Sequence, residues 1–403
     1  MRIFSSNNVS EIKKVMSDIG VDPYGIKIML PKTSILLVRL NEISNISANI
    51  LKQEMLSLGG DVAVARGALT GRSKKSPCLI IGQRNQFFSL IHKLRLQPFG
   101  LNRLADKLED GISKYTRSSL TLSLRKNFLN FGAKTRIMGA INLTPDSFSG
   151  DGLYSVKSGN YPELALEKAR QMLKDGADII DLGGESSRPG AKSISVKEEL
   201  RRVLPVVKKL AKNIKAPISI DTTKIEVARA GLDSGAQLIN DISGLRDKRM
   251  AKIAAKYKAA VVIMHMLGRP ANMQNKIAYK SLIEDIMLWL KNAVDFAEYA
   301  GIGPDKIIID PGIGFAKTAG QNLEIINRLA DFKILGKPIL IGPCRKSFIG
   351  SVLNASPQER CIGTVAACVM AAERGANIVR VHDVKQVSQA LKMAAAIRSC
   401  ANA

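Results

Sequence analysis

The chain has 403 residues, of which 46% are hydrophobic and 24% charged, and its formal net charge is +25. Such a composition is typical of a soluble globular protein, and the sequence contains no run of about 18 apolar residues that could span a membrane. The N-terminus lacks the apolar core of a secretory signal, so we expect a cytoplasmic protein.

The positive charge is spread along the chain rather than gathered in one basic arm. Neither an aromatic-rich RNA-binding signature nor a zinc-finger spacing accompanies it, so we predict no nucleic-acid partner. A positive field would still speed the capture of an anionic substrate such as a diphosphate. The five cysteines are odd in number and form no C-x-x-C pair, which argues against a disulfide framework or a cysteine zinc site.

Residues 1–120 are predicted to form a small α/β domain, and the sequence assigns it no role. Residues 111–136 lack a strong hydrophobic periodicity and are predicted to be a linker with a short β element that plugs the bottom of the following domain. Since the small domain is taken to end at residue 120, the linker itself is set at residues 121–136. In the small domain the pattern predicts strands at Thr33–Leu40, Asp61–Leu69 and Pro77–Ile81 and helices at Ser47–Leu58 and Asn85–Leu94.

Residues 137–403 alternate short apolar runs with amphipathic stretches, such as Pro162–Lys174 and Val196–Lys212. Apolar runs of this length are typical of buried parallel strands. Eight of them within about 265 residues predict a (β/α)8 TIM barrel, and the glycine-rich turn of a dinucleotide-binding open sheet is missing. The predicted strands are Ile137–Ile141, Asp178–Leu182, Pro217–Ile220, Gln237–Ile239, Ala260–Met264, Lys306–Ile309, Pro338–Ile341 and Asn377–Val381.

Nearly every predicted strand runs into a polar residue at its carboxyl end. The carboxyl ends of barrel strands converge on one face, which carries the active site in enzymes of this fold. A single aspartate after a strand is usually a helix cap, but eight polar groups in register are hard to explain in that way. These residues are Asn142, Asp181 with Glu185, Asp221, Asn240 with Asp241, His265, Asp310, Arg345 with Lys346, and Arg380 with His382.

Several of these residues suit particular chemical groups. A buried carboxylate and amide, as at Asp221 and Asn240, suit the donor and acceptor edge of an aminopyrimidinone ring. Alternation along the last strand puts Arg380 and His382 on the same side, where they would form an anion pocket together with Arg188. His265 could equally be a ligand or base, or a core histidine held by its neighbours.

A polar loop rich in Pro, Gly, Ser and Asp follows Asn142 and extends to residue 152. Such a loop is suited to acting as a lid over a site. The Asn142 side-chain oxygen could bind Mg2+ alongside substrate phosphates, because this cation prefers oxygen ligands and keeps few protein ones.

From about residue 130 to the end, these motifs occur in the same order as in the dihydropteroate synthase family, which the sequence resembles. The resemblance implies a transferase of folate biosynthesis that condenses 6-hydroxymethyl-7,8-dihydropterin diphosphate with p-aminobenzoate, needs Mg2+ and is a target of sulfonamides. It also implies the site. The pterin would contact Asp221, Asn240, Met264, Asp310 and Lys346; diphosphate and Mg2+ would contact Asn142, Arg188, Arg380 and His382; and p-aminobenzoate would contact Ser187, Phe315 and Cys344.

Two positions depart from the family pattern. Ser187 stands where threonine is usual, which keeps the hydroxyl. Cys344 stands where serine is usual, and because a thiol is a poorer donor, this change is expected to weaken acceptor affinity. The neighbouring Arg345 and Lys346 are expected to favour the Cys344 thiolate.

Two other functions remain open on the sequence. A pterin-dependent methyltransferase of the same barrel superfamily would use the pterin pocket but not the basic groups suited to a diphosphate. A non-catalytic pterin or nucleic-acid binder would use the N-terminal domain. Many barrels of this kind are dimers, so we expect a homodimer.

Overall fold

The computed structural model describes residues 1, 9–70, 74–125, 127–132, 134–144, 160–188, 190–268, 273 and 277–399. The chain divides into two compact units, one formed by Met1–Lys114 with Ala396–Ala403 and the other by Tyr115–Ala395. Most of the loop that was expected to act as a lid after Asn142 lies outside the described residues.

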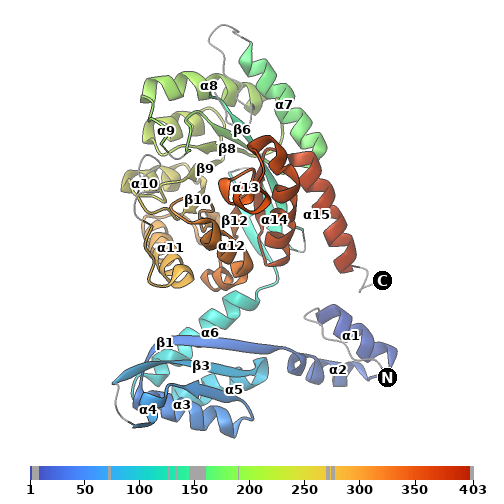
Figure 1. Ribbon diagram of the computed structural model, residues 1–403, viewed down its shortest axis with the longest axis vertical. Coiled ribbons are helices and arrows are strands. Elements are labelled where there is room, and N and C mark those ends of the chain that lie inside the picture. The colour runs from blue at the N-terminus through green and yellow to red at the C-terminus, as the bar shows by residue number, and fades with distance from the viewer. Residues whose placement is uncertain are drawn as a thin grey trace. The chain divides into compact units, whose positions relative to one another are not determined.

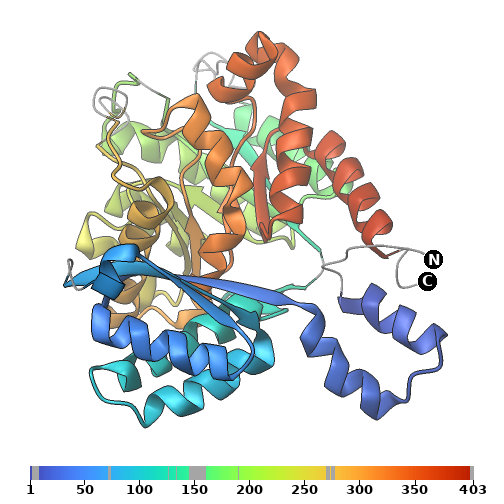
Figure 2. The same cartoon turned by 60° about the horizontal axis from the view of Figure 1, so that its bottom comes forward.

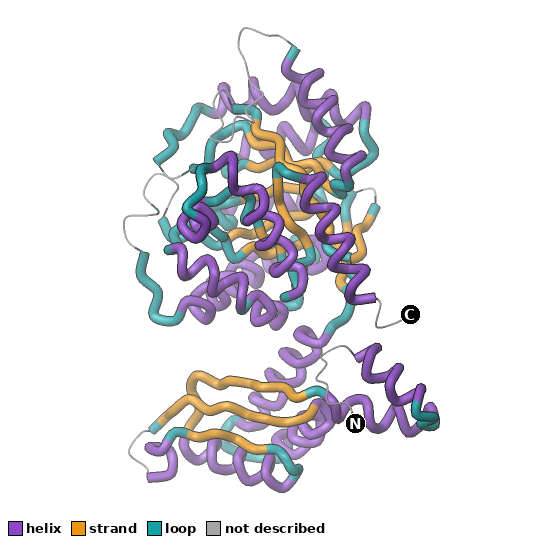
Figure 3. Tube along the Cα trace, turned by 45° about the vertical axis from the view of Figure 1, so that its right-hand side comes forward, coloured by secondary structure: helices purple, strands orange, loops and turns teal. Residues whose placement is uncertain are grey.

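The N-terminal unit is an antiparallel sheet of three strands in the order β1-β3-β2, covered by helices. Figures 2 and 3 show these strands side by side, with helices against one face. Its elements are α1 (Val9–Asp18), α2 (Pro23–Met29), η1 (Leu30–Thr33), β1 (Ile35–Ser44), α3 (Asn45–Ser57), β2 (Asp61–Val64), α4 (Arg66–Thr70), β3 (Lys75–Gln83), α5 (Arg84–Arg95) and α6 (Leu101–Thr116).

The small α/β region is therefore confirmed, but its second strand is shorter than predicted. The strand expected at Asp61–Leu69 ends at Val64, and Arg66–Thr70 form a short helix. Alanine and leucine favour helix and glycine disfavours strand, so the composition after Val64 opposes a continued strand. The core between sheet and helices is made of Leu51, Met55, Ile80, Phe87, Leu90 and Leu94 among others.

Helix α6 continues to Thr116, into the start of the 111–136 segment for which no strong period was found, and the first compact unit ends at Lys114. Helix α6 is strongly amphipathic, and its apolar stripe from Leu101 to Ile112 is buried. A two-stranded hairpin follows, formed by β4 (Leu120–Ser123) and β5 (Phe128–Phe131).

The second unit is a closed barrel of eight parallel strands, as predicted. Strands that are neighbours in the chain pair with each other, and the first strand also pairs with the last. A parallel bridge between Ile309 and Ile339 joins the sixth strand to the seventh and closes the ring. The strands are β6 (Arg136–Asn142), β7 (Ile179–Gly183), β8 (Ile218–Asp221), β9 (Leu238–Asp241), β10 (Ala260–Met264), β11 (Ile307–Asp310), β12 (Leu340–Ile341) and β13 (Ile378–Val381).

Helices surround the strands on the outside of the barrel (Figure 1). None of the helices among the described residues is long and apolar enough to cross a membrane. They are α7 (Tyr161–Asp175), α8 (Val196–Asn213), α9 (Ile225–Asp233), α10 (Lys248–Lys256), α11 (Leu282–Tyr299), η2 (Pro304–Lys306), α12 (Ala319–Asn327), η3 (Leu329–Leu335), α13 (Ser347–Leu353), η4 (Pro357–Arg360), α14 (Cys361–Glu373) and α15 (Val384–Ser399).

The hairpin closes the amino-terminal end of the barrel. Its side chains Leu122 and Phe131, each at most 1% exposed, pack in one cluster with inward residues of the strands such as Met138 and Val262. Apolar side chains thus fill the barrel interior at this end. Any polar site must therefore lie at the opposite, carboxyl end.

Candidate functional site

The Arg380 side chain joins the ends of β13, β7 and β8 by hydrogen bonds at the carboxyl edge of the barrel. Its Nε donates to Asp181 Oδ2 at 2.7 Å and its Nη2 donates to Asp221 Oδ2 at 2.9 Å. Asn240 Nδ2 donates to Asp181 at 3.3 Å, which adds a fourth strand. The Asp181 side chain is fully buried, so this charge needs its cationic partner.

The carboxyl group of Asp221 is poised to change its charge near neutral pH. Burial raises the pKa of Asp221 to about 7, against the opposing effect of Arg380, and the carboxylate of Asp181 raises it further. For Arg380, burial lowers the pKa, but the two carboxylates outweigh burial and raise it overall. The cluster thus holds a fixed cation beside a carboxyl group that can be ionised or neutral.

Asp310 and Lys346 come from the next part of the same edge. Gly312 N–H donates to Asp310 Oδ1 at 2.7 Å, and burial raises the pKa of Asp310. Lys346 Nζ donates to the carbonyl of Ile313 and lies 4.5 Å from the centre of the Phe315 ring. Burial lowers the pKa of Lys346 to about 8, so its charge is easily lost above neutral pH.

Lys317 and His265 form a buried pair behind this edge. Lys317 Nζ lies 3.1 Å from His265 Nδ1 and donates to the carbonyl of Phe315 at 3.0 Å. Burial lowers the pKa of Lys317 to about 7 and that of His265 to about 2. The His265 ring is 1% exposed and meets Trp289 edge-on at 5.2 Å. These contacts favour the interpretation of His265 as a core histidine held by its neighbours.

Gly312 accounts for the close fit of the loop after β11. Its φ is +76°, and a Cβ built there would lie 2.0 Å from the carbonyl oxygen of His265. Only glycine adopts this conformation without strain and allows such an approach. The loop that carries Phe315 and Lys317 is therefore fixed against the end of β10.

A second chain of contacts joins β6, β12 and β13. Asn142 Nδ2 lies 3.1 Å from His382 Nε2, and His382 Nδ1 lies 3.4 Å from Cys344 Sγ. The backbone N–H of His382 also donates to Cys344 Sγ at 3.3 Å. Arg380 and His382 therefore both reach the barrel mouth, where strand alternation placed them.

The expected Cys344 thiolate is contradicted. Burial raises the pKa of Cys344 to about 11, and the carboxylate of Asp383 opposes ionisation as well. The nearby Arg345 does not compensate because its Nε donates to Asp383 Oδ2 at 2.9 Å. Lys346 is turned toward Ile313 and Phe315. The two cations that follow Cys344 in sequence are thus engaged elsewhere.

A cavity of ≈650 Å³ opens at the same end of the barrel. Two predicted site residues, Ser187 and Asp221, line it. Met264 and Phe315 pack in one apolar cluster with Met266, which also lines the cavity. Arg188 is half-buried in the loop after β7. The remaining lining residues are Glu185, Ser186, Ala191, Ser193, Thr222, Thr223, Ile242, Ser243, Arg246, Asp247 and Lys248.

Three charged residues at this end received no role from the sequence. They are Asp181, which binds Arg380, Lys317, which binds Phe315 and His265, and Lys224, which forms two ion pairs. Asp181 was already placed at a strand end from the sequence, and its need for a buried partner could also have been inferred, because a carboxylate in the middle of an apolar strand requires one. The sequence offers no comparable signal for Lys224, which follows two threonines in a polar loop.

Comparisons with known proteins match the second unit. A family model described as pterin binding enzyme matches residues 138–382. The dihydropteroate synthase of Synechocystis sp. is 45% identical over 278 residues, which are 68% of this chain and 94% of that protein. A crystal structure of the Yersinia pestis dihydropteroate synthase with a sulfonamide drug complex is 41% identical, with a TM-score of 0.66, and the match covers 70% of this chain and 100% of that one.

Some relatives match beyond the barrel. A probable bifunctional folylpolyglutamate synthase/dihydropteroate synthase of Halobacterium salinarum is 37% identical over 356 residues, which are 88% of this chain but 42% of that protein. A match over 356 residues is longer than the second unit and therefore includes part of the N-terminal unit. The 278 residues of the Synechocystis match are few enough to lie within the second unit alone.

Proposed function

This chain belongs to the dihydropteroate synthase family, and from that premise we propose how its own residues carry out the reaction. The enzyme joins 6-hydroxymethyl-7,8-dihydropterin diphosphate to p-aminobenzoate, giving 7,8-dihydropteroate and diphosphate. The observation that carries the assignment of residues is the Arg380 cluster, because it places a buried carboxylate and a fixed cation at the carboxyl end of the barrel.

In the proposed pterin pocket, the carboxylates of Asp221 and Asp310 accept hydrogen bonds from the N–H groups of the ring. The Asn240 amide and the Lys346 ammonium offer donors to the ring carbonyl and nitrogen. Met264, at 2% exposure, supplies an apolar surface for the flat face of the ring. A few polar groups on an apolar wall are typical of small-molecule pockets.

The diphosphate is proposed to meet Arg188, Arg380 and His382. Two of the five N–H donors of Arg380 are used by Asp181 and Asp221, so others remain for a phosphate oxygen. Arg380 then serves two purposes, because it holds Asp221 in place for the pterin and faces the leaving group.

Mg2+ is proposed to bind the Asn142 side-chain oxygen together with the substrate phosphates. The site fits this cation, because the amide nitrogen of Asn142 is directed toward His382, which leaves the oxygen as a ligand. Among the described residues no group of three or more His, Cys, Asp or Glu side chains could hold a metal ion, and Mg2+ commonly keeps one or two protein ligands. When bound, it would help to neutralise the diphosphate.

The chemistry needs no nucleophilic side chain. The bond between the pterin methylene carbon and the diphosphate oxygen breaks, and the leaving group takes the electron pair. The arylamine nitrogen of p-aminobenzoate then bonds to that carbon and loses a proton to solvent. Arg188, Arg380 and His382 stabilise the charge that develops on the leaving oxygen, while the pterin pocket holds the carbon in reach of the amine.

The pH dependence of kcat/KM for the pterin diphosphate should follow a narrow bell with limbs near pH 7 and pH 8. Asp221, whose pKa is raised, loses its charge as the pH falls through the acid limb. Lys346, whose pKa is lowered, loses its charge as the pH rises through the alkaline limb. Steady-state rates from pH 5.5 to 10 check this. Lys346→Arg should remove the alkaline limb, and a flat profile in the parent enzyme would contradict the assignment.

Cys344 is proposed to lie at the p-aminobenzoate subsite with Ser187 and Phe315. Replacing Cys344 by serine should keep activity and lower the KM for p-aminobenzoate about threefold, since a hydroxyl donates a better hydrogen bond to the carboxylate. Steady-state kinetics with p-aminobenzoate as the varied substrate measure this. An unchanged KM would place Cys344 outside the acceptor subsite.

The raised pKa of Cys344 also alters the expected behaviour of its thiol. Alkylation near pH 7 should be slow, and its rate should rise about tenfold per pH unit until it levels off near pH 11, because the thiolate is the reactive form. The inactivation rate by iodoacetamide as a function of pH tests this.

Sulfonamide inhibition, competitive with p-aminobenzoate, is a further part of the proposal, supported by the drug complex of the Yersinia pestis relative.

A product assay tests the function itself. Incubating the protein with Mg2+, the pterin diphosphate and p-aminobenzoate should yield dihydropteroate and diphosphate in equal amounts, and omitting p-aminobenzoate should stop dihydropteroate formation. Methyl transfer from a reduced folate to a corrinoid without dihydropteroate would instead point to the methyltransferase alternative.

The cytoplasmic location, the homodimer and the lack of a nucleic-acid partner remain predictions.

A further inference from the structure

Lys224 is held between two carboxylates at the edge of the cavity. Its Nζ lies 2.9 Å from Glu185 Oε2 and 2.6 Å from Glu199 Oε2. The Glu199 side chain is fully buried and that of Lys224 is 15% exposed. Burial lowers the pKa of Lys224, but the hydrogen bonds to Glu199 and Glu185 outweigh it and raise the pKa overall. The lysine is therefore charged at neutral pH.

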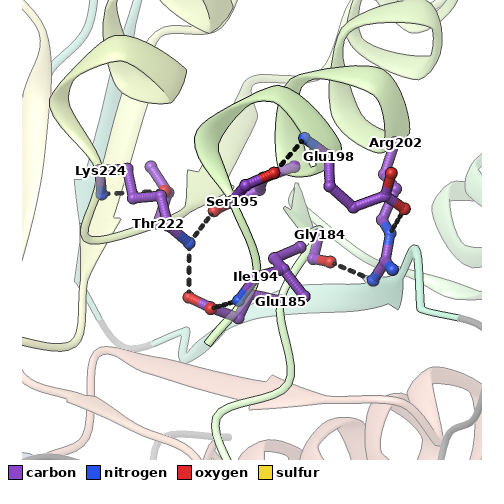
Figure 4. Close-up of polar contacts among 9 residues, drawn as sticks. Gly184, Glu185, Ile194, Ser195, Glu198, Arg202, Thr222 and Lys224 are labelled. Carbon is purple, nitrogen blue, oxygen red and sulfur yellow. Dashed lines mark hydrogen bonds and ion pairs between the residues drawn. The ribbon is translucent and has the colours of Figure 1, made fainter. Parts of the chain in front are cut away.

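Glu185 also closes the loop that follows β7. Its Oε1 accepts a hydrogen bond from the backbone N–H of Ile194 at 2.7 Å, which joins the two ends of residues 185–194 (Figure 4). At the start of this loop, Arg202 Nη1 donates to the carbonyl of Gly184 at 3.0 Å. Glu185 and Arg202 thus fix the base of the segment that carries Ser187 and Arg188.

The ion pairs of Lys224 join two walls of the cavity. One wall is lined by Glu185, Ser187 and other residues of the 185–194 loop, and another by Asp221 and Thr222. Lys224 follows that second wall directly in the chain, where its backbone N–H donates to Thr222 Oγ1 at 3.1 Å. Lys224 is not itself a lining residue. Its contacts set the position of one wall relative to the other.

We propose that Lys224 is a positioning residue that clamps the 185–194 loop to the wall beside Asp221, so that Ser187 and Arg188 meet p-aminobenzoate and the diphosphate. This inference rests on the proposed function. It separates Lys224 from the pterin pocket, because Asp221 is held independently by Arg380 from β13.

Loss of the lysine charge leaves the fully buried Glu199 without its cation, and its first effect is on the loop. Without it, Glu185 and Glu199 face each other without a cation, and two like charges at close range repel. Glu199 belongs to helix α8 and is fixed by packing, whereas Glu185 is on the loop and can turn to solvent. Its hydrogen bond to Ile194 would be lost in that movement, and the loop would open.

The test is a kinetic comparison of Lys224→Met with the parent enzyme. The KM for p-aminobenzoate should rise about tenfold or more, which corresponds to losing roughly one anchored contact, while kcat changes less than about threefold. Affinity for 6-hydroxymethyl-7,8-dihydropterin, measured by calorimetry, should stay within about twofold. Lys224→Arg should recover most of the lost acceptor affinity because it keeps the charge.

Two further variants sharpen the test. Glu185→Gln keeps the Lys224–Glu199 pair and should raise the same KM, so the inference stays testable if Lys224→Met does not fold. Arg201→Met on the same helix removes a pair between Glu198 and an arginine that is 56% exposed, and it should leave the KM unchanged. An unchanged KM in both Lys224→Met and Glu185→Gln would overturn the inference, as would an equal loss of pterin affinity. A parent enzyme that forms no dihydropteroate would instead overturn the proposed function.

Discussion

Replacing Arg380 by methionine is expected to lower the free energy of unfolding by about 3–5 kcal/mol, the usual cost of removing one partner of a buried ion pair. The variant leaves Asp181, fully buried, and Asp221 next to each other without their cation. Urea denaturation followed by circular dichroism at pH 7.5 measures the change. Lowering the pH should narrow the difference from the parent, because a protonated carboxyl group needs no counter-charge.

An exposed ion pair provides the matched control. Lys291 pairs with Asp295 on helix α11, and both side chains are more than half exposed. Lys291→Met should change stability little, since exposed pairs contribute little. If Arg380→Met were as mild as this control, Asp181 and Asp221 would not depend on Arg380 for their charge.

Replacing Asp221 by alanine is expected to weaken pterin binding at least about 30-fold, because two ring N–H donors each lose an acceptor at about 1–3 kcal/mol. Calorimetric titration with 6-hydroxymethyl-7,8-dihydropterin measures this directly. Asp221→Asn should give an intermediate loss, since the amide keeps one acceptor but adds a donor where the ring also donates.

Asp178 is a suitable control for this experiment. Asp178 directly precedes β7 and lies at the amino end of the barrel, where it pairs with Arg136 at 2.8 Å. Asp178→Asn should leave pterin affinity unchanged, because the amino end of the barrel is closed by the hairpin. Unchanged affinity in Asp221→Ala would remove Asp221 from the pterin pocket.

The barrel could be predicted because its signal is local and repeated. Each strand is a short apolar run that ends in a polar residue, and the period of two along β13 was enough to put Arg380 and His382 on one side. A short β element was also predicted within residues 111–136, where the hairpin of β4 and β5 lies. The strand predicted at Asp61–Leu69 was too long. Val and Leu around an Ala-rich stretch are compatible with a strand, but Arg66–Thr70 fold as a helix.

The partners of the charged residues could not be predicted in the same way. The sequence shows that Arg345 and Lys346 follow Cys344, but not that Arg345 binds Asp383 and that Lys346 lies on Phe315. Adjacency in the chain suggested a thiolate, whereas burial and the three-dimensional contacts raise the pKa of the Cys344 thiol. Contacts between residues far apart in sequence determine the electrostatics of this site.

The central claim is that the pterin lies against the carboxylates at the ends of β8 and β11, beside the Arg380 cluster. A crystal structure of the protein with the pterin diphosphate and Mg2+ tests it most directly. We predict ring N–H groups within hydrogen-bond distance of Asp221 and Asp310, with the diphosphate at Arg188 and His382. A pterin bound elsewhere, with Asp221 and Asp310 contacting only protein groups, would contradict the account.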